Sequence, residues 1–302
     1  MVSNESPAVA RRRLRLALRK AREAMGLTQG QIADALEWSL SKVNRIESGE
    51  VTISHTDLGA LLRVVGVTNP DVIQGLTEDA RASRRRGWWD EPRVREHLTP
   101  ATLQLLQFES QASIIRCFHS MLIPGLLQTR TYAESVFNVW THEISDADRA
   151  ARIDVRMQRP AQVFGRPDPP KYLVILDESV VYREVGGAKV MADQLYEVLV
   201  IGENPRVTVR IVPFAAAAPL ALLGPFTIFD LGDEENAVLY REGGGPSEDE
   251  IVHSSEAISR HRLIFEHMWE RSLTAEATAR QIQARAAAML ASLDRDQNYS
   301  YP

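Results

Sequence analysis

The chain has 302 residues, of which 44% are hydrophobic and 25% charged; this composition excludes an intrinsically disordered chain and predicts about two globular domains. Because no apolar run approaches the roughly 18–20 residues of a membrane span and Cys117 is the single cysteine, we expect a cytoplasmic protein with no membrane contact and no internal disulfide. The net charge of -5 divides into fourteen Lys and Arg against ten Asp and Glu in residues 1–86, and twenty-one against thirty thereafter, which suggests a basic anion-binding module joined to an acidic domain.

Residues 1–10 show no apolar periodicity, and we expect them to form a disordered tail. Residues 11–79 are the first expected domain, because apolar residues recur there at the three- and four-residue spacing of amphipathic helices. Caps, glycines and a proline divide this segment into five expected helices, which run from about Leu14 to Met25, Thr28 to Leu36, Ser39 to Gly49, Thr56 to Val65, and from Pro70 onward.

The second and third expected helices have the features of a helix-turn-helix, which places its second helix in the major groove of DNA. Thr28 and Ser39 are of the N-cap type, and Ala33 is small where the two helices must approach each other closely. The N-terminus of a helix favours phosphate, so Gln29 is well placed to donate a hydrogen bond to the DNA backbone. The residues predicted to contact phosphate are Lys20, Arg22, Thr28, Gln29, Ser39, Lys42 and Asn44.

The third expected helix carries apolar residues at Val43 and Ile46, which face the core and leave the other side of the helix for solvent or DNA. Ser41 and Arg45 lie four residues apart and therefore share one face. An arginine grips guanine through two hydrogen bonds, and Leu40 can meet a thymine methyl group. We therefore predict that Leu40, Ser41 and Arg45 read bases. The alternative is a helical hairpin with a solvated, charged face.

The motifs "LTQGQIADAL" and "S-x-S-K-V-x-R-I-E-S-G" resemble the Xre/Cro family of phage-repressor-like helix-turn-helix domains over residues 14–76. The resemblance implies binding to double-stranded DNA, with phosphate contacts at the positions of Gln29 and Lys42. It implies base contacts at the positions of Leu40, Ser41 and Arg45.

Two positions depart from the pattern of that family. Glu37 stands where the family usually has a glycine, and Trp38 stands where it usually has a small aliphatic residue. If Glu37 has a positive φ, its side chain costs about 1 kcal/mol. Trp38 can staple the third helix by packing on the neighbouring turn, and it can alter how that helix sits.

Residues 80–96 mix charge, glycine, tryptophan and proline, and we expect them to be the linker to a C-terminal domain at 97–293, followed by a flexible tail at 294–302. The expected helices of this domain cover about His97 to Phe118, a stretch ending near Trp140, and residues 146–158, 190–200, 254–272 and 275–293. The expected strands cover 171–178, 207–214, 225–231 and 236–242. This order predicts a mainly α protein whose second domain is α+β, with a small, mostly antiparallel sheet and flanking helices.

The segment "PGLLQT", which continues to Tyr132 and Ala133, resembles a domain of unknown function found in a group of actinobacterial Xre regulators; the resemblance spans about residues 100–275. It implies an antitoxin-like regulator, often encoded beside a small partner protein, and it implies no known ligand. The apolar content of PGLLQT favours a packed helix break over a ligand cradle.

Catalytic and metal-binding patterns are weak in this chain. Asp177 and Glu178 end a strand and begin a helix, where carboxylates act in some enzymes but equally cap a helix, which we favour. His253, His261 and His267 lack the close spacing of a metal site. We therefore expect no enzymatic activity, no metal and no cofactor.

Together these patterns predict a sequence-specific transcriptional regulator that binds a palindromic operator as a homodimer. The C-terminal domain is expected to dimerise and to sense an effector molecule or a small partner protein. The alternative is a partner-binding, antitoxin-like interaction protein in which DNA binding is secondary.

Overall fold

The computed structural model describes residues 7–48, 51–84, 87–217, 224–231, 237–245 and 248–298. The chain divides into two compact units, Met1–Asp90 and Glu91–Pro302, and the boundary falls inside the segment 80–96. Most of the tail predicted at 1–10, the glycine expected to close the third helix, and the last four residues lie outside the described residues. The two units are described separately below.

The first unit is helical, as the sequence predicts. Its five α-helices are α1 (Pro7–Ala24), α2 (Gln29–Leu36), α3 (Leu40–Ser48), α4 (His55–Val64) and α5 (Pro70–Ala82), followed by the short 3-10 helix η1 (Trp88–Asp90). Their apolar faces meet in one core formed by Leu14, Leu18, Ile32, Ala33, Val43, Ile46, Ile53, Leu58, Leu61, Leu62, Val65, Leu76 and Ala80. Truncating a buried leucine of such a core to alanine costs about 2–5 kcal/mol.

Polar side chains fix where these helices begin. Thr28 and Gln31 form a reciprocal capping box at the start of α2, in which each side chain bonds the other residue's backbone N–H. The Ser54 hydroxyl accepts from the N–H of Asp57 at the start of α4. Asn69 caps α5, whose first residue is a proline that has no N–H to satisfy.

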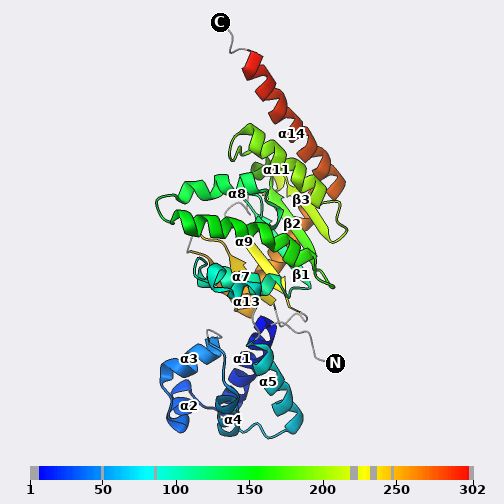
Figure 1. Ribbon diagram of the computed structural model, residues 1–302. Coiled ribbons are helices and arrows are strands. Elements are labelled where there is room, and N and C mark those ends of the chain that lie inside the picture. Colours follow the sequence, from blue (N-terminus) through cyan, green and yellow to red (C-terminus); the bar gives the residue numbers. More distant parts are fainter. Residues whose placement is uncertain are drawn as a thin grey trace. The chain divides into compact units, whose positions relative to one another are not determined.

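The second unit contains helices on a mixed sheet (Figure 1). Its α-helices are α6 (Pro92–Arg95), α7 (Pro100–Glu109), α8 (Arg130–Phe137), α9 (Asp146–Phe164), α10 (Glu178–Tyr182), α11 (Ala188–Ile201), α12 (Phe214–Ala217), α13 (Ser255–Arg271) and α14 (Ala275–Asn298), and its 3-10 helices are η2 (Gly125–Leu127) and η3 (Asn138–Trp140). Its strands are β1 (Ile114–His119), β2 (Lys171–Asp177), β3 (Val207–Val212), β4 (Phe226–Asp230), β5 (Ala237–Arg241) and β6 (Glu250–Val252).

The strands form a sheet in the order β3-β2-β1-β4-β5-β6. The pairs β1–β2 and β2–β3 are parallel, whereas β1–β4, β4–β5 and β5–β6 are antiparallel. The prediction of an α+β domain with a mostly antiparallel sheet and flanking helices is therefore confirmed. The parallel part follows from the helical crossovers between β1, β2 and β3.

One predicted helix is wrong. The helix expected from His97 to Phe118 ends at Glu109, and Ile114–His119 forms β1, which lies between β2 and β4 in the sheet. A short apolar run does not distinguish a buried helix from a buried strand. The β-branched pair Ile114 and Ile115 favours the strand, because such side chains pack well on a pleated surface.

Helices cover the sheet and position its loops. One core cluster joins β4 and β5 to α13 through Phe226, Ile228, Leu239, Phe265 and Met268. The helices α8 and α9 contact each other, and α11 packs along α14 (Figure 1). In the part of the chain that the structure describes, no helix has the length and apolar content to cross a bilayer.

Candidate nucleic-acid interface and cavity

The exposed face of α3 is the first candidate site. Val43 and Ile46 are buried in the core of the first unit, as predicted. Leu40 is 50% exposed, and Ser41, Asn44 and Arg45 are exposed as well. Because Ser41 and Arg45 lie one turn apart, the helix presents an apolar side chain, a hydroxyl and a guanidinium on its outer surface. These are residue types that read base edges in a major groove.

The corner before α3 is set by the two residues that depart from the helix-turn-helix pattern. Glu37 has a φ of 54°, in the left-handed region, and its N–H donates to the carbonyls of Ala33 and Asp34. Trp38 is half-buried against the core, and its N–H donates to the Ala33 carbonyl over 2.8 Å. The Lys42 ammonium lies 3.9 Å from the centroid of the Trp38 ring and 3.2 Å from an oxygen of Asp57. Trp38 and Lys42 thus tie the first turn of α3 to its surroundings.

Glu47 joins three helices of the first unit, a role that the sequence did not reveal. Arg22 of α1 donates from Nε to Glu47 Oε1 over 2.7 Å, and Gln29 of α2 donates from Nε2 to Glu47 Oε2 over 2.8 Å. Arg22 also donates to the Leu27 carbonyl over 2.7 Å. The hydrogen bond from Arg22 to Glu47 raises the pKa of the guanidinium. Arg22 and Gln29, both predicted to contact phosphate, therefore also hold α3 in place.

The remaining predicted phosphate-contacting residues lie on exposed positions or helix ends. Lys20 and Asn44 are exposed. Thr28 caps α2, and the Ser39 hydroxyl accepts from the N–H of Lys42 over 3.2 Å at the start of α3. Two helix N-termini thus offer backbone N–H groups. Contact with DNA at all ten predicted residues stays a prediction.

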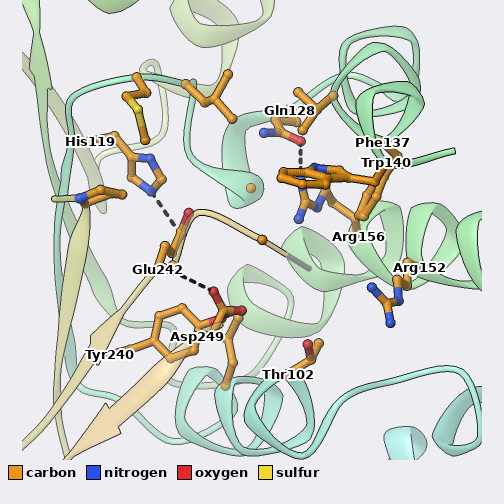
Figure 2. Close-up of a pocket in the computed structure, with 18 of the residues that line it drawn as sticks. Thr102, His119, Gln128, Phe137, Trp140, Arg152, Arg156, Tyr240, Glu242 and Asp249 are labelled. Carbon is orange, nitrogen blue, oxygen red and sulfur yellow. Dashed lines mark hydrogen bonds and ion pairs between the residues drawn. The ribbon is translucent and has the colours of Figure 1, made fainter. Parts of the chain in front are cut away.

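The second candidate site is a cavity of about 250 Å³ in the second unit (Figure 2). Its wall is built from α7, the end of β1, the PGLLQT segment, α8 and η3, α9, and the end of β5 with the glycines that follow it. Figure 2 labels ten of its lining residues: Thr102, His119, Gln128, Phe137, Trp140, Arg152, Arg156, Tyr240, Glu242 and Asp249. The sequence did not point to this cavity.

An ion pair forms one side of the cavity. His119 Nε2 at the end of β1 lies 3.2 Å from Glu242 Oε1. Burial alone lowers the pKa of His119, but the charge of Glu242, together with that of Cys117 and hydrogen bonds to both residues, outweighs it and raises the pKa to about 10. Burial likewise raises the pKa of Glu242, but His119, Arg156 and Arg159 outweigh it and lower the pKa to about 2. Both groups are therefore charged at neutral pH.

A second ion pair, between Arg159 and Glu109, lies next to Gly125 of the PGLLQT segment. Arg159 donates from Nε to Glu109 Oε2 over 2.9 Å and from Nη2 to Glu109 Oε1 over 2.5 Å, and both residues are buried. A Cβ on Gly125 would lie 2.9 Å from Arg159 Nη1. The glycine of PGLLQT therefore leaves room for this guanidinium.

Arg156 differs from the other charged groups of the cavity. One of its Nη atoms donates to Gln128 Oε1 over 2.9 Å, and its guanidinium lies 4.6 Å from the centroid of the Phe137 ring. Among the described residues, no carboxylate forms an ion pair with it. Burial, followed by the charge of Arg159, lowers the pKa of Arg156 to about 10, so the group is still charged at neutral pH.

Gln128 connects PGLLQT to the cavity. Its Nε2 donates to the Ile123 carbonyl over 2.7 Å, which leaves its Oε1 for Arg156. The neighbouring Leu126 and Leu127 are buried, in agreement with a packed segment. PGLLQT is therefore both a packing element and part of a cavity wall.

A tyrosine and a carboxylate complete the wall. The Tyr240 hydroxyl donates to Asp249 Oδ2 over 2.5 Å, and the N–H of Gly243 donates to Asp249 Oδ1 over 3.1 Å. Burial raises the pKa of both Tyr240 and Asp249.

The sequence analysis did not single out the three arginines of α9 that line the cavity, although their spacing is visible in the sequence. Arg152, Arg156 and Arg159 are spaced four and three residues apart, which puts them on one face of α9. A basic stripe on an amphipathic helix is usually a solvated face, so this spacing alone does not indicate a cavity. Asp177, by contrast, caps α10 as predicted, because its Oδ1 accepts from the N–H of Ser179 over 2.9 Å. Among the described residues no group of His, Cys, Asp and Glu is arranged to hold a metal ion.

Two protein families match this chain. A helix-turn-helix domain matches residues 13–73, which covers most of α1, all of α2, α3 and α4, and the start of α5. A domain of unknown function (DUF5753) matches residues 102–284, more than half of the chain and nearly all of the second unit. No curated protein and no solved structure matches the chain.

Proposed function

Because the chain belongs to the DUF5753 family and carries a helix-turn-helix domain, we propose that it is a sequence-specific transcriptional regulator whose second unit senses a small molecule. The proposal assigns the first unit to double-stranded DNA and assigns no catalytic activity to either unit. The observation that carries it is the outer face of α3, where Leu40, Ser41 and Arg45 are exposed above a buried apolar face. A helix of this kind enters the major groove.

The internal contacts of the first unit support this role, because a reading helix must be held rigidly. Glu47 on α3 accepts hydrogen bonds from Arg22 on α1 and Gln29 on α2. The guanidinium and amide groups of Arg22 and Gln29 retain further N–H donors, which are those we assign to phosphate. An Xre/Cro-like mode of docking follows, with α3 in the groove and the N-terminus of α2 at the backbone.

We further propose that the protein acts in the cytoplasm as a homodimer on a palindromic operator. Two copies of α3 would then enter successive major grooves about 34 Å apart. This part of the proposal predicts pseudo-palindromic half-sites about one helical turn apart. Analytical ultracentrifugation of the chain with one operator duplex measures how many chains bind each duplex. We expect two chains per duplex, and one chain per duplex contradicts the dimer.

Selection of bound duplexes from a random pool tests the proposal as a whole. The full chain should enrich one motif, and fluorescence anisotropy at one fixed salt concentration should give at least about a thousandfold tighter binding to that motif than to random duplex. Binding of equal strength to every duplex, or no binding, contradicts sequence-specific regulation. Co-purification of a neighbour-encoded small protein, with no enriched motif, favours the alternative in which partner binding is primary.

A further inference from the structure

We propose that the cavity of the second unit binds a small organic monocarboxylate, and that Arg156 holds its carboxylate group. The inference rests on the small-molecule sensing that we propose for this unit. Gln128 of the PGLLQT segment holds Arg156 in the cavity wall, in position for the ligand.

The first argument is the balance of charges around the cavity. His119 is paired with Glu242, and Arg159 is paired with Glu109. Arg156 is bonded to a neutral amide and stacked on an aromatic ring, and the described carboxylates form no ion pair with it. Glu242 and Asp249 act on Arg156 through charge interactions but make no ion pair with it, so the site has a place for a carboxylate in direct contact with the guanidinium.

The geometry of Arg156 suits a carboxylate. Its contact with Phe137 and its bond to Gln128 fix the plane of the guanidinium. A guanidinium has five N–H donors, and the bond to Gln128 uses one of them. The remaining donors form the planar fork that binds a carboxylate through two parallel hydrogen bonds. Figure 2 shows Arg156 beside Gln128, Phe137 and Trp140, with Glu242 and Asp249 on the other side of the cavity.

The opposite wall limits the charge of the ligand. Glu242 is ionised at neutral pH, and Asp249 presents a second carboxyl group. A second negative charge on the ligand would approach these groups and be repelled, whereas a single carboxylate beside Arg156 is neutralised by the guanidinium. We therefore infer a monoanion and exclude dicarboxylates and phosphate esters from the proposal.

The size and lining of the cavity describe the rest of the ligand. A volume of about 250 Å³ lies just below the small end of ligand pockets, which span roughly 300–1,000 Å³. The apolar part of the wall includes Leu98, Leu105, Val136, Phe137, Trp140 and Val155. Such a site fits a compact body of about ten non-hydrogen atoms that buries an apolar or aromatic surface. Benzoate has this size and charge, and benzamide is its neutral counterpart of the same shape.

Isothermal titration calorimetry of the full chain tests the proposal with benzoate and benzamide as probes. Benzoate should bind at one site per chain, and benzamide should bind at least about tenfold more weakly, because it lacks the charge that Arg156 recognises. Inorganic phosphate should bind more weakly than benzoate. Equal affinity for benzoate and benzamide, no benzoate binding, or stronger binding of phosphate overturns the proposal.

Variants of α9 locate the site. Arg156→Met should weaken benzoate binding at least about tenfold, and Arg156→Lys should recover part of the affinity because it keeps the charge but not the fork. The matched control is Arg149→Met, on the same helix, where Arg149 bonds Asn138 and Asp146 on the surface and does not line the cavity. Equal losses in the Arg149 and Arg156 variants contradict the assignment.

Thermal unfolding without ligand separates recognition from a structural role. If Arg156 serves to bind an anion, Arg156→Met should unfold at about the same temperature as the parent chain, because the hydrogen-bond acceptor of Arg156 is the neutral Gln128 and the substitution breaks no ion pair among the described residues. A clear drop in the unfolding temperature contradicts a binding role. Anisotropy with the selected operator is measured on the same samples, so a failure of DNA binding is seen separately from a failure of benzoate binding.

Discussion

The α2–α3 corner of the first unit and the cavity of the second unit use arginine in opposite ways. At the corner, Arg22 and Glu47 form an ion pair with the side chains 12% and 8% exposed, and Gln29 adds a further bond to Glu47. In the cavity, Arg156 has the neutral Gln128 as its hydrogen-bond acceptor. An arginine in an ion pair with a carboxylate fixes geometry, whereas an arginine held in position without an ion pair keeps its paired donors for a ligand.

The largest loss of stability should come from removing the Glu47 side chain, which links α3 to α1 and α2. Glu47→Ala leaves the Arg22 guanidinium and the Gln29 amide without their shared acceptor, so we expect the free energy of unfolding of the first unit to fall by about 3 kcal/mol. Chemical denaturation followed by circular dichroism measures this. The double variant Arg22→Met/Glu47→Leu should recover much of the loss, since neither charge is then left unpaired. A loss below about 1 kcal/mol in the single variant contradicts the positioning role of Glu47.

The next largest loss of stability should come from filling the space beside Gly125 that the Arg159 guanidinium occupies. Gly125→Ala puts a Cβ 2.9 Å from Arg159 Nη1, while Glu109 holds that guanidinium in place. We expect a destabilisation of about 1–3 kcal/mol, measured by denaturant unfolding. The control is Gly59→Ala in α4, where a Cβ meets nothing within 4 Å and the variant should gain up to about 1 kcal/mol. Equal stability of the Gly125→Ala variant and the parent chain would show that Arg159 moves freely.

The ion pair between His119 and Glu242 in the cavity should make stability depend on pH. The pKa of His119 is raised from the ordinary 6.5 to about 10, so its contribution is fully present below pH 6.5 and is lost as the pH rises through about 10. The unfolding temperature of the parent chain should therefore approach that of His119→Gln between pH 6.5 and pH 10. A constant difference between the two chains over this range contradicts a charged His119.

The smallest change in stability should come from relieving the backbone strain at Glu37, between α2 and α3. Glu37 has a φ of 54°, a conformation that costs a side chain about 1 kcal/mol and costs glycine nothing. Glu37→Gly should raise the free energy of unfolding by up to about 1 kcal/mol. Ala35→Gly, inside α2, should lower it by about the same amount. If both variants lose stability, Glu37 contributes a contact that outweighs its strain.

The sequence predicts helices and helix caps better than it predicts contacts between segments that are far apart in the chain. The five helices of the first unit, the inward Val43 and Ile46 and the caps at Thr28 and Ser39 follow from periodicity and residue type. The central strand β1 was missed because a short apolar run fits a helix or a strand, and the choice depends on pairing with β2 and β4.

The cavity could not be predicted for a related reason. His119 and Glu242 are separated by more than a hundred residues, and they meet because the ends of β1 and β5 lie on either side of the start of β4. The arginine spacing in α9 marks one face of the helix, but what lies opposite Arg156 depends on the PGLLQT segment and η3. Glu47 was missed because its partners lie on two other helices.

The central claim is that α3 reads bases, and one comparison tests it most directly. The affinity of the full chain for the selected operator and for its single-base variants is measured at fixed salt for the parent chain, Arg45→Ala and the control Arg63→Ala on α4. We predict that Arg45→Ala removes about 1–3 kcal/mol of discrimination at one base pair of each half-site, and that Arg63→Ala leaves discrimination unchanged. Weaker binding of Arg45→Ala to every sequence by the same factor would contradict the account, because Arg45 would then contact the backbone and not the bases.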